Sequence, residues 1–415
     1  MNLWRLLLNK AFKFIDFDER IGIEKLYEYL SDFRDFEEIL YGANPFYRDH
    51  TYHCINLYLM GEYLFRDNKM YNRLRMFTPR SVNRIDAESA IFCIISLTHD
   101  IGYPIEILNS INQNISKMYS HYKNIKLNEL SFEFPLVYQG IFEYLIDILS
   151  ITPDPKKSNN LDYERESEEK YGKPIGYIEL KKAPEIMQHL KPQISKALID
   201  YNHGLFSCFK LIENLHLFKD NYGISFSNLN LVKKKGRFLI DERFLISQLI
   251  LKTIHYHSTT DVRICEEDLM HLWFNLLDDI SEWSRYTKAE GYSNVPGFCK
   301  IDVKHFSLEK IEIHFIYENY FKDSNNNYSK SSKPCAKYRE LVKKYYQIIN
   351  PNIKTKIKFI ILDESNHINY IFERTKGVFK PKLEIPKFNI SSDEIFDLIM
   401  KKNGLEEQLK KANPP

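Results

Sequence analysis

The sequence has few cysteines and no Cys-x-x-Cys pair. Dispersed cysteines argue against a disulfide framework and against a zinc finger, because both need cysteines at paired spacings. This pattern favours a protein of the reducing cytoplasm. The six cysteines are Cys54, Cys93, Cys208, Cys265, Cys299 and Cys335.

The chain as a whole has no large excess of one charge, and its N-terminus has no long apolar run. The formal net charge is +2 over 415 residues, so bulk charge indicates neither nucleic acid nor a membrane surface as a partner. The apolar part of residues 1–20 is shorter than a membrane span and carries charges, so we expect neither a signal peptide nor an anchor. The expectation is a cytoplasmic protein without membrane contact.

Most of the first three-quarters of the chain has helical periodicity. Between these helices, residues 152–185 are charged and contain Pro and Gly, which predicts a surface insertion that is either a lid or a passive loop. Residues 220–241 predict a small hairpin. Apolar residues recur at helical spacing, or run without interruption, over 21–41, 51–66, 87–99, 105–122, 136–150, 183–190, 192–216, 242–257 and 266–286.

The pattern changes after residue 290. Residues 310–318 and 356–364 alternate apolar with polar side chains and predict strands, with a third strand at 368–374. Residues 332–350 predict a helix that crosses this sheet, and residues 391–412 predict a C-terminal helix that opens with a capping box.

The sequence therefore predicts a mainly α fold in three parts. These are an N-terminal helical segment (1–44), an all-helical core domain (45–290) and a smaller α+β region (291–415). The α+β region has no catalytic motif. Its open roles are contact with a second copy of the chain or with a partner protein, binding of a regulator, and packing on the helical core.

The most informative feature is the doublet His99 and Asp100 in SLTHDIGYPIE. The run before it is apolar almost all round, as in a buried helix, and Gly102 and Pro104 end that helix directly after the doublet. Neighbouring residues of a straight helix point about 100° apart, whereas at a helix end they can converge on one ion. Imidazole nitrogen with carboxylate oxygen suits Mn, Fe, Zn or Ni better than Ca.

Together with two other segments, the doublet resembles the HD-domain superfamily of metal-dependent phosphohydrolases. The pattern of that family is a histidine, a His-Asp doublet and a distant aspartate. The first histidine is His53, in the run RDHTYH that begins at Arg48. The distant aspartate falls in LWFNLLDDISEW, where the alignment chooses Asp278 and leaves Asp279 open. The resemblance covers residues 45–290 and implies an HD-type helical core.

Two further histidine positions, which dinuclear members of the family use, correspond to His203 in IDYNHGLFSCFKL and to His257 or His255 in ILKTIHYHS. The resemblance implies one or two divalent ions (Mn, Fe, Mg, Co, Ni or Zn). Arg48 is the best candidate for holding phosphate, because a guanidinium can bind it through two hydrogen bonds. The implied metal ligands are His53, His99, Asp100, Asp278, His203 and His257, and the implied catalytic residues are Asp100, His99, Arg48 and His203.

The chemistry that this resemblance implies is hydrolysis of a phosphate ester or anhydride of a nucleotide, in which the metal activates water. We expect deoxynucleoside triphosphates to be slightly preferred, in bacterial nucleotide control or antiviral defence against phage. The segment after the doublet nevertheless departs from the pattern of the deoxy-GTP hydrolases. The alternatives are a phosphodiesterase for a cyclic nucleotide or an oligonucleotide, and a non-enzymatic subunit that senses a nucleotide.

Replacing either residue of the doublet tests the ligand assignment. Asp100→Ala and His99→Ala should each abolish bound metal and turnover, because an ion with few protein donors does not tolerate the loss of one. The measurements are the metal content of the purified protein and its turnover, with circular dichroism to show that the variant is folded. Full metal content and near-normal rates in either variant would contradict the assignment.

Overall fold

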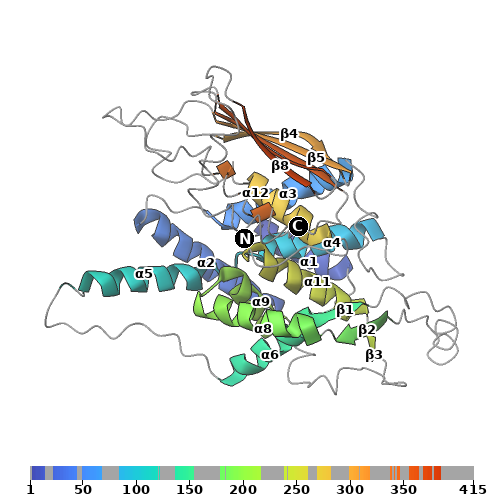
Figure 1. Cartoon of the computed structure of the whole chain (residues 1–415). Coiled ribbons are helices and arrows are strands. Elements are labelled where there is room, and N and C mark those ends of the chain that lie inside the picture. The colour runs from blue at the N-terminus through green and yellow to red at the C-terminus, as the bar shows by residue number, and fades with distance from the viewer. Residues whose placement is uncertain are drawn as a thin grey trace, which may run out of the picture.

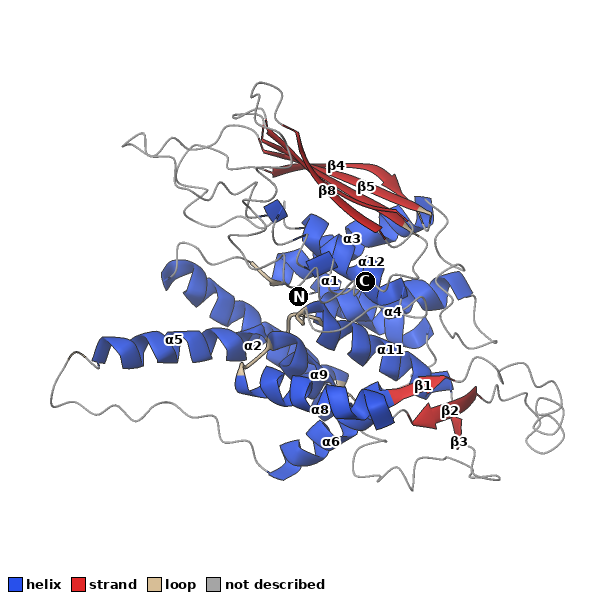
Figure 2. Ribbon diagram, viewed as in Figure 1, coloured by secondary structure: helices blue, strands red, loops and turns tan. Residues whose placement is uncertain are grey.

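The structure analysed is a computed structural model. It describes residues 2–14, 22–43, 49–67, 84–119, 121, 136–153, 178–182, 184–215, 238–240, 242–259, 269–281, 299–307, 309–317, 337–338, 341, 344–345, 355–363, 368–375 and 378–384. A helical body makes up most of this part of the chain, and a C-terminal sheet lies at one side of it (Figure 1, Figure 2). The predicted mainly α fold with a smaller α+β region is confirmed at this level.

Helices form close to where the apolar periodicity predicts them. They are α1 (Asn2–Phe14), α2 (Ile23–Ala43), α3 (Thr51–Asp67), α4 (Arg84–Thr98), α5 (Tyr103–Tyr119), α6 (Leu136–Ser150), α8 (Pro184–Ile199), α9 (His203–Asn214), α11 (Glu242–His257) and α12 (Leu269–Ser281).

One predicted helix boundary is wrong. The sequence predicted helices over 183–190 and 192–216, but α8 continues through the exposed Pro192, and the break falls between α8 and α9. Tyr201 has a positive φ of 53°, and the Asn202 side chain accepts a hydrogen bond from the backbone N–H of Leu205. This N-cap starts α9 at His203, which places that histidine at a helix end.

Helix α4 is the centre of the core. Its residues from Ala87 onward are buried, as expected of a helix that is apolar all round, and it packs against α1, α3 and α11. By length and composition, one stretch of the described residues, Asp86–Tyr119, could cross a membrane, and 67% of its most apolar window is buried inside the protein. A core helix of a globular protein has the same property.

Three short strands form a small antiparallel sheet beside the helical body: β1 (Ile151–Pro153), β2 (Ile178–Lys182) and β3 (Phe238–Ile240). Strands β1 and β2 lie at the two ends of the predicted insertion, whose residues 154–177 are outside the described residues. The hairpin predicted over 220–241 is described only at 238–240, where β3 pairs with β2.

The second sheet has five strands in the order β4-β5-β6-β7-β8, and only β5 and β6 pair in parallel. The three predicted strands are confirmed as β5, β6 and β7, whereas β4 and β8 were not predicted. The C-terminal helix expected over 391–412 lies outside the described residues. The strands are β4 (Cys299–Phe306), β5 (Lys310–Tyr317), β6 (Lys356–Asp363), β7 (Ile368–Thr375) and β8 (Val378–Glu384).

One face of this sheet packs toward the helical body. Ile313, Phe315 and Phe359 on β5 and β6 are buried. Phe306 on β4 contacts Trp273 of α12, with ring centroids 4.8 Å apart. The helix predicted over 332–350 is described at residues 337, 338, 341, 344 and 345, and all five are helical.

The contact between the end of α4 and helix α9 gives a stability prediction. A Cβ atom at Gly102 would overlap the backbone of His203 and Ser207, so Gly102→Ala should lower the free energy of unfolding by about 1–3 kcal/mol. Urea unfolding measures this change. As a matched control, Gly140→Ala in the exposed part of α6 should be neutral or stabilising, because alanine is the better helix former. Equal stability in the Gly102→Ala variant would show that this close packing is not required.

Candidate metal centre

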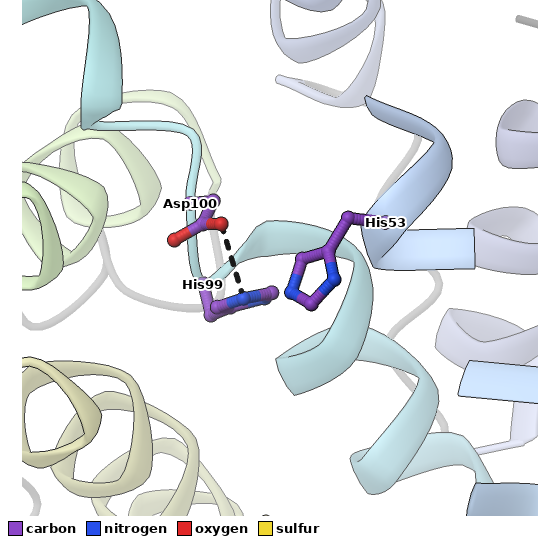
Figure 3. Close-up of side chains that lie close together, drawn as sticks. All are labelled: His53, His99 and Asp100. Carbon is purple, nitrogen blue, oxygen red and sulfur yellow. Dashed lines mark ion pairs between the residues drawn. The ribbon is translucent and has the colours of Figure 1, made fainter. Parts of the chain in front are cut away.

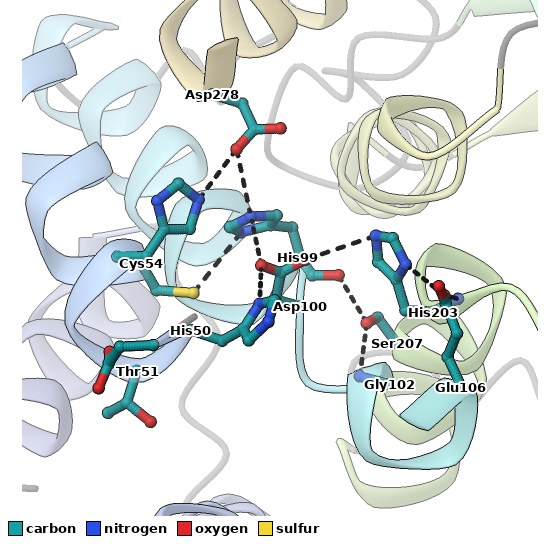
Figure 4. Close-up of polar contacts among 12 residues, drawn as sticks. His50, Thr51, Cys54, His99, Asp100, Gly102, Glu106, His203, Ser207 and Asp278 are labelled. Atoms are coloured by element: carbon teal, nitrogen blue, oxygen red, sulfur yellow. Dashed lines mark hydrogen bonds and ion pairs between the residues drawn. The ribbon is translucent and has the colours of Figure 1, made fainter. Parts of the chain in front are cut away.

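The predicted ligands come from α3, α4, α9, α11 and α12 and lie close together. Figure 3 shows His53, His99 and Asp100, and Figure 4 adds His203 and Asp278. His53 lies in the first turn of α3, and the doublet directly follows α4. His203 begins α9, His257 ends α11, and Asp278 lies in the last turn of α12. Each residue lies at or near the end of its helix. The helix ends can therefore meet at one place, while the rest of each helix extends away from it.

Asp100 is shared between two groups of donor atoms. His53, His99 and Asp100 place ligand atoms within 4.8 Å of one another, and so do Asp100, His203 and His257. The Asp100 side chain is buried, and its Oδ2 lies 3.3 Å from His99 Nε2. Its Oδ1 lies 3.5 Å from His203 Nε2 and 3.6 Å from His257 Nε2. The two oxygens therefore face different groups.

Asp278 lies beside the two histidines of the first group, and Asp279 does not. Asp278 Oδ1 lies 2.9 Å from His53 Nε2 and 3.9 Å from His99 Nε2. Asp279 points to another neighbour, because its carboxylate contacts Lys344 and Lys337. Of the two positions that the sequence left open, Asp278 is the one beside the histidines.

In the second group, His257 is placed at the centre and His255 is not. His203 Nε2 and His257 Nε2 are 3.0 Å apart. His255 is buried, and burial lowers its pKa to about 3, but it belongs to neither group of donor atoms within the described residues. Arg48 lies outside the described residues.

The tautomers of His203 and His257 indicate that a cation belongs between them. His203 Nδ1 donates to the Glu106 carboxylate at 2.6 Å, and His257 Nδ1 donates to the backbone carbonyl of Ile254. A neutral imidazole has one N–H, so both Nε2 atoms then carry lone pairs. Two lone pairs 3.0 Å apart repel each other unless a proton or a metal ion lies between them.

The same reasoning applies to the first group. The Ser281 hydroxyl donates to the backbone carbonyl of Asp278 and therefore accepts from His53 Nδ1, at 3.0 Å. The lone pair of His53 Nε2 then faces the Asp278 carboxylate. His99 Nδ1 donates to the backbone carbonyl of Ser96, and its buried Nε2 has no hydrogen-bond partner among the described residues. Each Nε2 atom is therefore an acceptor that faces another acceptor.

The residues therefore fit divalent metal ions. Donor atoms bound to an ion at about 2.1 Å lie roughly 3.0–3.4 Å apart in octahedral or tetrahedral coordination. The observed separations of 2.9–3.9 Å are close to that range. Imidazole and carboxylate donors suit Mn, Fe, Co, Ni and Zn, and all four ligand histidines have the other ring nitrogen hydrogen-bonded, as metal-bound histidines do.

The pKa directions show that the two buried carboxylates of the centre are held in their charged form. Burial raises the pKa of Asp100, but the neighbouring His99 and His50 outweigh burial and hold this pKa well below its ordinary value. Burial raises the pKa of Asp278 as well, and the neighbouring His53 imidazole, 2.9 Å from Asp278 Oδ1, outweighs it. Both carboxylates are therefore ionised at neutral pH.

The pKa values of the two histidines in the second group are shifted in opposite directions. Burial lowers the pKa of His257 to about 4, which keeps its imidazole neutral and able to bind a metal. Burial also lowers the pKa of His203, but the hydrogen bond with Glu106 and the charge of Asp100 outweigh burial, so this pKa is raised. A position that favours a proton in this way also favours a metal cation.

Several residues that the sequence did not single out hold the ligands in place. Glu37 of α2 accepts from the backbone N–H groups of His50 and Thr51 and so caps the helix that carries His53. Ser207 accepts from Gly102 N–H and donates to the carbonyl of His99. These contacts join residues 13 to 108 positions apart, so no local pattern signals them.

His50 and Tyr103 form one wall of the centre. His50 Nδ1 lies 2.8 Å from Asp100 Oδ2, and the His50 and Tyr103 ring centroids are 3.6 Å apart. Tyr103 also meets His203 edge-on, with ring centroids 6.0 Å apart. This wall joins the two groups of ligands on the side of α5.

No protein-family model, no curated protein and no solved structure matches the chain. The assignment of the centre therefore depends on its own residues and their geometry.

The Glu106 carboxylate gives a prediction about the second group. Removing the acceptor of a ligand histidine typically weakens metal binding by about 10–100-fold, because the ring loses its orientation and its tautomer. Glu106→Ala should therefore weaken binding of the second Mn²⁺ ion in a titration by at least about tenfold. Glu213→Ala is the matched control, since Glu213 pairs with Lys210 on the same helix as His203. Equal affinities in both variants would contradict the role of Glu106.

Proposed function

We propose that the chain is a metal-dependent phosphohydrolase of the HD-domain type that acts on a phosphate ester or anhydride of a nucleotide. The observation that carries this proposal is the Asp100 carboxylate shared by two sets of histidine lone pairs. A pair of adjacent ions at such a carboxylate would lower the pKa of a water molecule and neutralise charge on a phosphoryl group.

The residues of the chain divide this work. His53, His99 and Asp278 would hold one ion, His203 and His257 would hold the other, and Asp100 lies between the two sets of ligands. Asp278 and His203 are the most accessible of these ligands, with side chains 19% and 20% exposed, so we place the substrate on their side. His50 Nδ1 donates a hydrogen bond to Asp100 Oδ2, which restricts the rotation of this carboxylate.

Deoxynucleoside triphosphates are the substrates that we propose to test first, in keeping with a role in nucleotide control or antiviral defence. A cyclic-nucleotide or oligonucleotide phosphodiesterase uses the same ligand chemistry and is the alternative. A nucleotide-sensing subunit needs the same centre but no turnover.

The experiment combines metal analysis with a turnover screen. The purified chain should carry close to two metal ions, and His257→Ala should reduce this toward one and cut turnover by about 10² or more, because one of two ions that clamp the phosphoryl group is lost. His305→Ala, an exposed histidine on β4, is the matched control and should change neither value.

The substrates for the screen are nucleoside triphosphates, cyclic mononucleotides and cyclic dinucleotides, with Mn, Mg, Co and Fe. Hydrolysis in ¹⁸O-water should place the label on a phosphate-containing product, since attack is on phosphorus. One metal per chain with full activity would contradict the dinuclear centre. Tight retention of an intact nucleotide without phosphate release would identify a sensing subunit instead.

A further inference from the structure

Asp279, next to the proposed ligand Asp278, is held by the α+β region. Its Oδ2 accepts a hydrogen bond from the Tyr345 hydroxyl and lies 3.0 Å from Lys344 Nζ. Its Oδ1 lies 3.7 Å from Lys337 Nζ. The Asp279 side chain is 8% exposed and those of Lys337 and Lys344 are 9% and 14% exposed, so this is an ion-pair cluster largely withdrawn from water.

The segment that carries the three partners of Asp279 is itself fixed on the five-stranded sheet. The Tyr345 ring packs against Phe359 of β6, with centroids 5.1 Å apart. The Tyr338 hydroxyl donates to the backbone carbonyl of Ile371 in β7, at 3.4 Å. The described positions between 337 and 345, here called the 337–345 segment, thus lie between the sheet and α12.

Adjacent residues of helix α12 therefore contact two different parts of the protein, the histidines and the 337–345 segment. Consecutive side chains on a helix point about 100° apart, so Asp278 faces the histidines while Asp279 faces the 337–345 segment. Phe274 lies on the metal side, where its ring meets His99 with centroids 5.1 Å apart. A rotation of α12 about its axis would move Asp278 away from His53 and, at the same time, break the contacts of Asp279.

We propose that Asp279 is a positioning residue of the metal centre, which uses Lys344 and Tyr345 to fix the rotation of α12 and so the place of Asp278 Oδ1. This inference rests on the proposed metal centre and extends it to the α+β region. Breaking a buried ion pair leaves a charge without its partner, so α12 cannot rotate without cost. The α+β region thereby contributes to metal affinity, although none of its described residues belongs to the donor groups.

The test is a titration of the metal-free full-length chain with Co²⁺, whose visible absorption reports coordination geometry. Asp279→Asn should weaken Co²⁺ binding by about tenfold and change the absorption spectrum, as the loss of an outer contact of a ligand does. Tyr345→Phe should act in the same direction, and the double variant should be less impaired than the product of the two single effects. Tyr345→Phe also keeps the test usable if Asp279→Asn does not fold.

Glu312→Gln is the matched control, because Glu312 also lies among nitrogen donors, with Lys310 Nζ at 2.8 Å and His314 Nε2 at 3.1 Å, but it is on β5. It should leave Co²⁺ affinity and spectrum unchanged. Asp278→Asn separates the two hypotheses. Wild-type binding in Asp279→Asn with a defect in Asp278→Asn overturns the positioning role alone. Unchanged binding in Asp278→Asn overturns the proposed metal centre and this inference with it.

Discussion

The Asp100 carboxylate is the group on which the rest of the structure depends. It is buried at the meeting point of the helices, and its two oxygens face two different pairs of imidazole nitrogens. His50 donates a hydrogen bond to this anion, but the Nε2 lone pairs of His99, His203 and His257 also face it. A buried anion beside lone pairs is unfavourable unless a cation compensates it. Divalent ions bound here would supply this compensation and would couple metal binding to the stability of the fold.

The orientation of the ligand histidines follows from the end of the helix at which each one lies. His99 and His257 are at C-terminal ends, where carbonyl groups are free, and each donates its Nδ1 hydrogen to a carbonyl three residues earlier. His53 and His203 lie in first turns, where N–H groups are free instead. Their Nδ1 hydrogens therefore go to side chains of other helices, a hydroxyl from α12 and a carboxylate from α5. All four Nε2 atoms are thereby directed toward the centre.

Helix α12 connects this centre to the C-terminal sheet. One side of the helix carries Phe274, Asp278 and Ser281 toward the histidines, and its other sides carry Trp273 and Asp279 toward the sheet and the 337–345 segment. Aromatic packing and a buried ion-pair cluster both lie on the sheet side, so the α+β region packs directly against the helix that carries Asp278. The sheet is therefore part of the environment of the centre and more than an appendage.

The sequence by itself determined the helices, three of the five strands of the large sheet and the set of candidate ligands, because apolar periodicity and the His-Asp doublet are local signals. It left Asp278 and Asp279 open, and likewise His255 and His257, since the side chain that faces inward depends on how each helix is rotated in the core. The sequence predicts a break between residues 190 and 192, whereas the chain leaves the helix near Tyr201, where the Asn202 side chain caps α9. Glu37, Glu106, Ser207 and Ser281 could be found only in the tertiary structure, because their contacts join helices distant in sequence.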